Sequence, residues 1–184
     1  MPCVLANRMH TTNKEVTHLA SAASLVGETG HVHAFEPSYS AARQLEKNVK
    51  LNEYSNITIH PKALTKERGL VHFYHRRHAA WGTLLDNVGF NPTQVYGVRL
   101  DDLISGTVDM IKIDVEGTEA DVLAGATHTL MNKILMDLHP DLGVNSAPVM
   151  AALKGKYQLF DIRSGFIPIQ SIPSGLVELL AVRS

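Results

Sequence analysis

Hydrophobic residues along the chain follow two spacings, and these predict two kinds of element. Short apolar or alternating runs are typical of strands, whereas apolar residues that recur every three to four positions are typical of amphipathic helices. The first pattern predicts strands at 30–35, 57–60, 71–74, 95–98, 109–114, 134–138, 157–162 and 176–182. The second predicts helices at 17–26, 38–51 and 148–153, and a helix that follows Gly117 and runs to Leu130.

The order of these predicted elements indicates the fold class. Strands that alternate with helices pair in parallel through right-handed crossovers, so an α/β fold with a mostly parallel sheet is expected. The chain closes with two predicted strands in succession, and we expect the C-terminal strand to be antiparallel. With 184 residues and no repeat or Pro/Gly/Ser-rich linker, the sequence predicts a single domain over residues 1–184.

The composition is that of an ordinary globular protein, with 45% hydrophobic and 19% charged residues. A formal charge of -1 argues against nucleic acid as a partner, and the basic run at 75–78 is typical of a solvated loop. The sequence shows no apolar run that could span a membrane and no signal peptide, and the lone Cys3 cannot form an internal disulfide. We therefore expect a cytoplasmic protein that binds neither nucleic acid nor membrane.

Polar side chains follow three of the predicted strands at their carboxyl ends. Glu36 follows the first of them, Asp114 and Glu116 the second, and Asp137 with His139 the third. Ligands of parallel α/β sheets bind beyond these ends, so we expect the side chains to line one crevice. Glu36 is placed to accept both hydroxyl hydrogen bonds of a ribose, although an acid there also suits the positive end of the next helix.

Two of these residues are candidates for a catalytic base. Asp114 is the first, because it is the first carboxylate beyond its strand, and His139 is the second. Glu116 is equally compatible with a role in the site and with charge compensation at the start of the next helix. Charge compensation is the favoured interpretation of Glu119.

Two of the ten histidines, His31 and His33, lie two residues apart in a predicted strand. Side chains at that spacing share a face, as the ligands of some metal sites do. No third ligand at a suitable spacing accompanies them in the sequence. We therefore predict no metal site.

Two strings are distinctive in combination: Ala-Phe-Glu-Pro at 34–37 and Lys-Ile-Asp-Val-Glu-Gly-Thr-Glu at 112–119. With them the chain resembles the FkbM-type methyltransferases over about residues 20–184. The matching stretches, in the family's order, are 26–37, 48–52, 62–64, 100–103, 111–119 and 122–126. The resemblance implies a three-layer, Rossmann-like methyltransferase fold.

The resemblance also implies a cofactor and a reaction. The cofactor would be S-adenosylmethionine, and the methyl group would pass to a small-molecule acceptor, commonly an oxygen of a sugar or another metabolite. Asp114 would face the methyl group or the acceptor. The residues that would bind the cofactor follow predicted strands: Glu36, Pro37, Lys62, Ala63 and Glu116.

The glycine-rich cofactor loop of the family is missing from this sequence. Such a loop lies between the first strand and the first helix, where backbone N–H groups approach the cofactor closely. No glycine precedes Gly27 here. The chain is then a truncated or misjoined gene product, a non-catalytic binding or interaction module, or an enzyme with a different cofactor loop. A nicotinamide-dependent dehydrogenase ranks lower, because its own glycine fingerprint is equally absent.

A shortened first strand would have a structural consequence. The sheet would lose its central member and expose apolar faces, unless residues 3–6 or a partner chain fill the place. A homodimer is therefore a further expectation.

Overall fold

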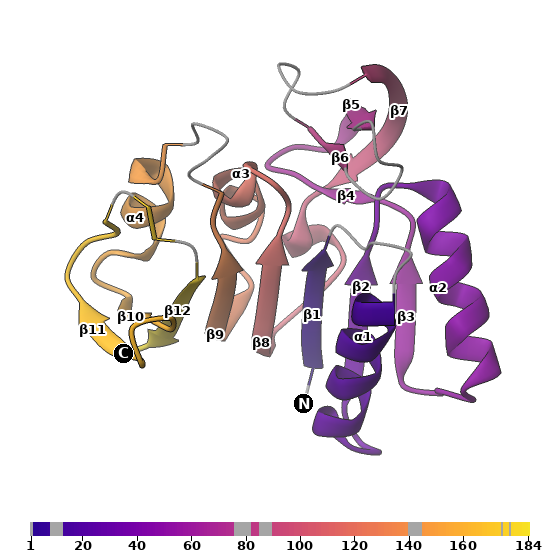
Figure 1. Cartoon of the computed structure of the whole chain (residues 1–184), viewed down its shortest axis with the longest axis horizontal. Helices are drawn as coiled ribbons and strands as arrows, with labels where there is room; N and C mark the ends of the chain where they lie inside the picture. The colour runs from indigo at the N-terminus through magenta and orange to yellow at the C-terminus, as the bar shows by residue number, and fades with distance from the viewer. Residues whose placement is uncertain are drawn as a thin grey trace.

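The structure is a computed structural model of the chain, and it describes residues 2–7, 13–75, 82–84, 90–139, 145–173, 175–176 and 178–184. Its strands form one sheet of eight strands and one of four. Helices lie on both faces of the larger sheet, and the smaller sheet lies beyond the carboxyl ends of its central strands (Figure 1).

The larger sheet has the strand order β11-β10-β12-β9-β8-β1-β2-β3. The run from β9 to β3 is parallel throughout, β12 is antiparallel to both of its neighbours, and β11 is antiparallel to β10. The predicted α/β fold, with a mostly parallel sheet and an antiparallel C-terminal strand, is confirmed. The strands are β1 (Pro2–Asn7), β2 (His31–Phe35), β3 (Ile57–His60), β8 (Thr107–Asp114), β9 (Leu130–Asp137), β10 (Tyr157–Asp161), β11 (Ile167–Ile169) and β12 (Glu178–Arg183).

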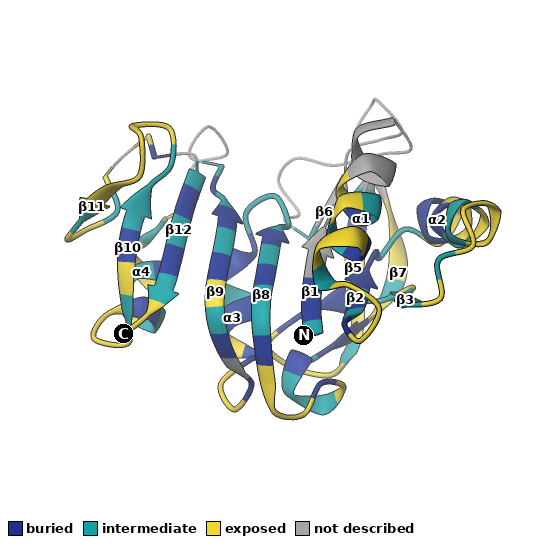
Figure 2. Ribbon diagram, turned by 90° about the horizontal axis from the view of Figure 1, so that it is seen from below, coloured by how far each residue is buried: buried dark blue, intermediate teal, exposed yellow. Residues whose placement is uncertain are grey.

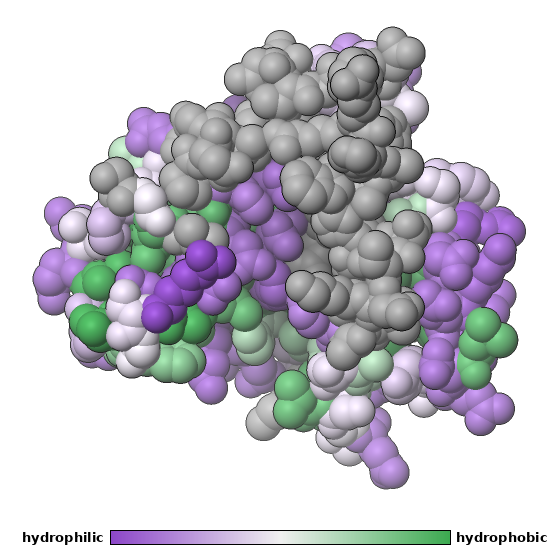
Figure 3. All heavy atoms as spheres, in the orientation of Figure 1, coloured by the Kyte–Doolittle hydropathy of each residue, from purple (hydrophilic) through white to green (hydrophobic). Residues whose placement is uncertain are grey.

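Helices cover different parts of the two faces of this sheet (Figure 2). On one face, α1 (Asn13–Val26) and α2 (Tyr39–Leu51) pack over β1 to β3. On the other, α3 (Glu119–Ala124) and α4 (Ala147–Leu153) pack over β8, β9 and β12. The outer surface of α2 is mostly hydrophilic, as its amphipathic pattern predicts (Figure 3). None of the helices in the described ranges is long and apolar enough to cross a membrane.

β1 holds the central position of the larger sheet. It pairs in parallel with β2 on one side and β8 on the other. Successive side chains of β1 pack on opposite faces of the sheet. Cys3 packs in the core under α1 and α2, whereas the fully buried Val4 packs in the core under α3 and α4. The chain thus fills this place with its own residues, and the homodimer stays a prediction.

A second sheet occupies the connection between β3 and β8. Its order is β4-β7-β5-β6, and a single 3-10 turn at Leu100–Asp102 leads from it toward β8. The predicted strands at 71–74 and 95–98 belong to this second sheet. The sequence did not predict β4 and β6 of this sheet or β11 of the larger sheet, because these strands are too short to show an alternation of apolar and polar residues. The bounds are β4 (Ala63–Leu64), β5 (Gly69–His75), β6 (Gly82–Thr83) and β7 (Phe90–Val98).

The helix after Gly117 is shorter than predicted, because α3 ends at Ala124 and β9 already begins at Leu130. Gly125 approaches the second sheet so closely that a Cβ there would lie 2.2 Å from the carbonyl oxygen of Thr65. Beyond it the chain leaves the helix, although Ala126 stays buried. The helical spacing of apolar residues continues to Leu130, although the helix itself ends at Ala124, so the predicted end of this helix was wrong.

Candidate functional site

The carboxyl ends of the three central strands meet at one edge of the larger sheet. The register aligns Phe35 of β2 with Ala6 of β1, and Ala6 with Ile113 of β8. The next residues on the two outer strands of this trio are Glu36 and Asp114. Only β1 lies between them, so their backbones are about 10 Å apart at the same level of the sheet.

Glu36 has a buried carboxylate, with 1% of the residue exposed. Its Oε1 accepts a hydrogen bond of 2.6 Å from the backbone N–H of Ser38. The carbonyl oxygen of His60, at the end of β3, accepts the N–H groups of Glu36 at 3.0 Å and of Lys62 at 2.8 Å. The structure thus places at the ends of β2 and β3 four of the residues predicted to bind a cofactor: Glu36, Pro37, Lys62 and Ala63.

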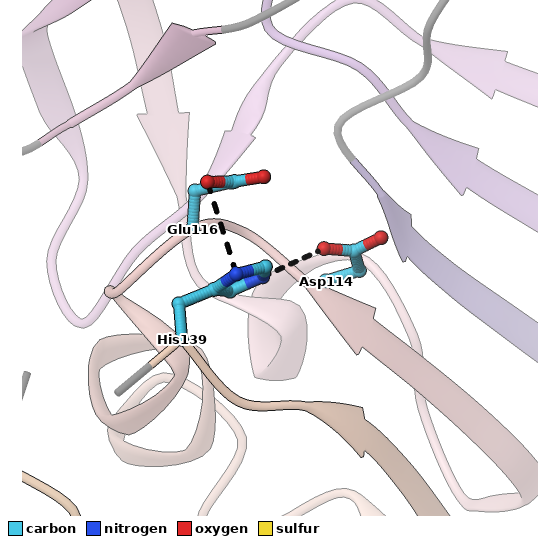
Figure 4. Close-up of side chains that lie close together, drawn as sticks. All are labelled: Asp114, Glu116 and His139. Carbon is cyan, nitrogen blue, oxygen red and sulfur yellow. Dashed lines mark hydrogen bonds and ion pairs between the residues drawn. The ribbon is translucent and has the colours of Figure 1, made fainter. Parts of the chain in front are cut away.

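The other predicted residues gather around an imidazole at the ends of β8 and β9 (Figure 4). His139 Nε2 lies 3.2 Å from Asp114 Oδ1, and His139 Nδ1 lies 3.9 Å from Glu116 Oε2. Glu116 has a left-handed φ of 56°, followed by Gly117 at 107°, where the chain turns from β8 toward α3. The imidazole of His139 therefore lies between two carboxylates. The sequence predicted that all three residues lie at one edge of the sheet, but it did not predict the contacts between them.

The carboxylates control the protonation of His139. Burial alone would lower the pKa of its imidazole, but the hydrogen bond to Asp114 and the charges of Glu116, Asp114 and Glu119 outweigh burial and raise it. Glu119 itself begins α3, is 1% exposed and accepts the N–H of Gly117 at 2.9 Å. Burial raises the pKa of Glu119. Glu119 thus lies in the first turn of α3, and its role in charge compensation stays a prediction.

Lys112 joins the two strand ends, a role that sequence analysis missed. Its Nζ lies 2.5 Å from Asp137 Oδ2 and 3.6 Å from Asp114 Oδ2. Lys112 and Asp114 share a face of β8 because they lie two residues apart, and this alternation was the signal available in the sequence. Asp137 therefore forms an ion pair with Lys112, whereas His139 contacts Asp114.

The cluster also has the dimensions of a cation site. One potential ligand atom from each of Asp114, Glu116 and His139 lies within 4.8 Å of the others, the only such group of three or more in the described ranges. Two carboxylates and an imidazole suit divalent transition metals. The ammonium of Lys112 already supplies a positive charge to Asp114. The sequence-based expectation of no metal stays a prediction.

The sequence profile of the methyltransferase FkbM domain matches residues 4–149. The chain belongs to the FkbM methyltransferase family. The match begins within β1 and ends in α4, so it includes Glu36, Asp114 and His139. Comparison with curated protein sequences gives no significant match.

Solved structures share the fold of this FkbM-family chain at low sequence identity. A methyltransferase FkbM from Methylobacillus flagellatus is 16% identical, with a TM-score of 0.60, 98% of this chain covered and 44% of that one. SMU.1697c from Streptococcus mutans, in complex with SAH, is 9% identical, with a TM-score of 0.54 and coverage of 100% and 88%. Aeropyrum pernix fibrillarin, with natively bound S-adenosyl-L-methionine, is 14% identical, with a TM-score of 0.54 and coverage of 100% and 66%. The chain thus spans less than half the length of the Methylobacillus protein.

Proposed function

We propose that the protein is an S-adenosylmethionine-dependent methyltransferase that acts on a hydroxyl oxygen of a sugar or another small metabolite. The observation that carries the proposal is the common level of Glu36 and Asp114 at the carboxyl edge of the central strands. Ligands of parallel α/β sheets bind beyond this edge. Membership of the FkbM methyltransferase family supports the same reaction class.

The residues at this edge suit the methyl donor. The Glu36 carboxylate, whose Oε1 also accepts the Ser38 N–H, has the acceptor chemistry that a ribose diol requires. Lys62 and Ala63 follow the next strand, where the adenine would lie. The connection between β1 and α1 contains no glycine, and residues 8–12 fall outside the described ranges. The fit therefore rests on the residues that follow β2, β3 and β8.

S-adenosylmethionine supplies a methyl group that is already electrophilic, so the chain's own residues have to position the acceptor and take its proton. We assign the proton acceptor as His139. The carboxylate of Asp114 accepts the Nε2–H of the neutral imidazole, a tautomer inferred from the hydrogen bond, and Nδ1 keeps a lone pair. Nδ1 takes the acceptor's hydroxyl proton as that oxygen receives the methyl group. Asp114 and Glu116 then stabilise the imidazolium.

Asp114, the first candidate base by sequence, has a positioning role in this mechanism. His139 and Lys112 flank its carboxylate at 3.2 and 3.6 Å. Asp114 therefore holds the tautomer and orientation of His139.

Calorimetric titration of the full chain with S-adenosylmethionine tests the proposal, and the expected result is one donor site per chain. His139→Ala should bind the donor as the wild type does and lose about 10²- to 10⁴-fold in transfer to a panel of sugar hydroxyls. Folded protein that binds no donor would contradict the proposal. A variant with undiminished transfer would remove His139 from the mechanism.

A non-catalytic binding module is the second candidate. The absence of any glycine before Gly27 favours it, because a close backbone approach to the donor is harder without glycine. The same titration separates the two functions, since a module of this kind keeps the fold without donor binding.

A further inference from the structure

Three histidines lie together on the outer part of the larger sheet, away from Asp114 and His139. Val32 and Ala34 of β2 and Ile57 and Ile59 of β3 pack toward α1 and α2. Side chains alternate along a strand, so the intervening residues point to the opposite face. These residues are His31, His33, Thr58 and His60, and all four are half-buried.

Two of the imidazoles already stand at the separation that a metal ion requires. His33 Nδ1 lies 3.2 Å from His60 Nε2. In a tetrahedral zinc site, with Zn–N bonds of about 2.0–2.1 Å, two nitrogen ligands lie about 3.3 Å apart. The separation of the two nitrogens thus fits an ion, and the rings would turn so that both lone pairs point at it instead of at each other.

The third imidazole neighbours this pair, although in its present rotamer the nitrogens of the three rings do not all lie within 4.8 Å of one another. The rings of His31 and His33 have centroids 4.7 Å apart. His31 Nε2 currently hydrogen-bonds to the Thr58 hydroxyl at 2.8 Å, so a rotation that exchanges this bond for the ion would complete three nitrogen ligands. Sequence spacing showed only the pair on β2, because His60 lies 27 residues beyond His33 and joins it only through the pairing of β2 with β3.

Packing holds His60 in place and its surroundings keep it neutral. The His60 ring stacks on the buried Phe35 ring at 4.4 Å with an interplanar angle of 12°. Burial and the nearby His33 and Lys62 lower the pKa of His60 to about 4, and burial and His31 lower the pKa of His33. Neutral imidazoles have a lone pair to give to a metal.

We propose that His33 and His60, with His31 as the third ligand, bind a zinc-class transition-metal ion that ties the edge strand β3 to β2. Imidazole ligands without carboxylates favour Zn²⁺, Ni²⁺ or Cu²⁺ over Mg²⁺ or Ca²⁺. Binding breaks the shared N–H···N hydrogen bond, and the imidazole that donates it moves its proton to its other ring nitrogen. His33 then carries its proton on Nε2 and His60 on Nδ1, and no net proton is released.

Titration of the full chain with Zn²⁺, without methyl donor, tests this site independently of the proposed function. We expect one strong site per chain, a rise in melting temperature with Zn²⁺, and at least tenfold weaker binding in His33→Ala and in His60→Ala. His72→Ala, at an exposed histidine of β5, is the matched control and should bind as the wild type does. His139→Ala should also bind normally.

The proposal would be overturned if zinc still bound to both His33→Ala and His60→Ala, or if His139→Ala abolished zinc binding. Either result would place the ion at the Asp114 cluster. If an alanine variant does not fold, imidazole ¹⁵N NMR of the wild type decides between the sites. Zinc should then shift the His33 and His60 resonances, and a shift confined to His139 would refute the proposal.

Discussion

At the scale of single residues, one imidazole organises the site. His139 lies between Asp114 and Glu116, and Lys112 connects Asp114 to Asp137. Each of these side chains comes from the end of β8 or β9 or from the turn that follows. The site therefore depends on a few short contacts, and single substitutions should separate donor binding from chemistry.

Replacement of Glu36 by Gln should weaken binding of S-adenosylmethionine by about 10- to 100-fold, because charge-assisted hydrogen bonds to the ribose are lost. The amide keeps the size of the side chain and an acceptor for the Ser38 N–H, so the fold should persist. Calorimetry measures the affinity and circular dichroism checks the fold. Unchanged affinity in E36Q would show that Glu36 does not hold the donor.

The rate of methyl transfer should rise with pH through the raised pKa of His139, because only the neutral imidazole accepts a proton. In Asp114→Asn the imidazole keeps a neutral acceptor for its Nε2–H but loses the negative charge that helps to raise its pKa, so the inflection should move to lower pH. The maximal rate should fall as well. A pH–rate profile of both proteins measures the shift, and coincident inflections would contradict the pairing of His139 with Asp114.

At the scale of elements, the junction between α3 and β9 depends on Asp101 in the turn after the second sheet. Its carboxylate is 6% exposed and accepts the backbone N–H groups of Thr127, His128 and Thr129 at 2.8 to 3.0 Å. Arg99 donates a further hydrogen bond at 2.8 Å. Burial raises the pKa of Asp101, but the hydrogen bonds from Thr129 and His128 outweigh burial and hold this pKa far below its usual range.

Asp101→Asn should lower the free energy of unfolding by about 3 kcal/mol at neutral pH, because hydrogen bonds to a charged acceptor are lost. The folded-state pKa is lowered, so this contribution is present above the unfolded pKa of about 4 and declines as pH falls below it. Urea unfolding of both proteins at several pH values measures this. Asp102→Asn, at the exposed ion pair with Arg68, is the control and should change stability less.

Asp101 also shows where sequence analysis succeeds and where it fails. Strands such as Ile57–His60 were predicted to the residue, because their alternation is local. The end of α3 was not predicted correctly, because contacts with Asp101 and Thr65 determine it, and these residues lie far from α3 in the sequence. The contacts of Lys112 with Asp137 and of His33 with His60 also join separate strands, so no local pattern contains them.

At the scale of the whole molecule, β1 connects the two halves of the larger sheet. The helices α1 and α2 cover one side of the strands around it, and α3 and α4 cover the other side of β8, β9 and β12. The edge at which Glu36 and Asp114 lie exists only because β1 pairs with both β2 and β8. Loss of β1 should therefore disrupt the fold and the site together.

Val4→Asp should lower the free energy of unfolding by more than about 3 kcal/mol, because it buries an unpaired charge at the centre of the sheet. Val4 is 0% exposed, whereas Leu51 on α2 is 80% exposed, so Leu51→Asp is the matched control and should be nearly neutral. The midpoint of urea unfolding measures both. Equal stability of the two variants would mean that β1 is not the central strand.

The most direct test of the account is a crystal structure of the chain with S-adenosylhomocysteine. The ribose hydroxyls should lie within hydrogen-bond distance of the Glu36 carboxylate, with the sulfur on the side of Asp114 and His139. Ligand bound away from the ends of β2 and β8, or with its ribose out of reach of Glu36, would contradict the central claim that these strand ends share one cofactor site.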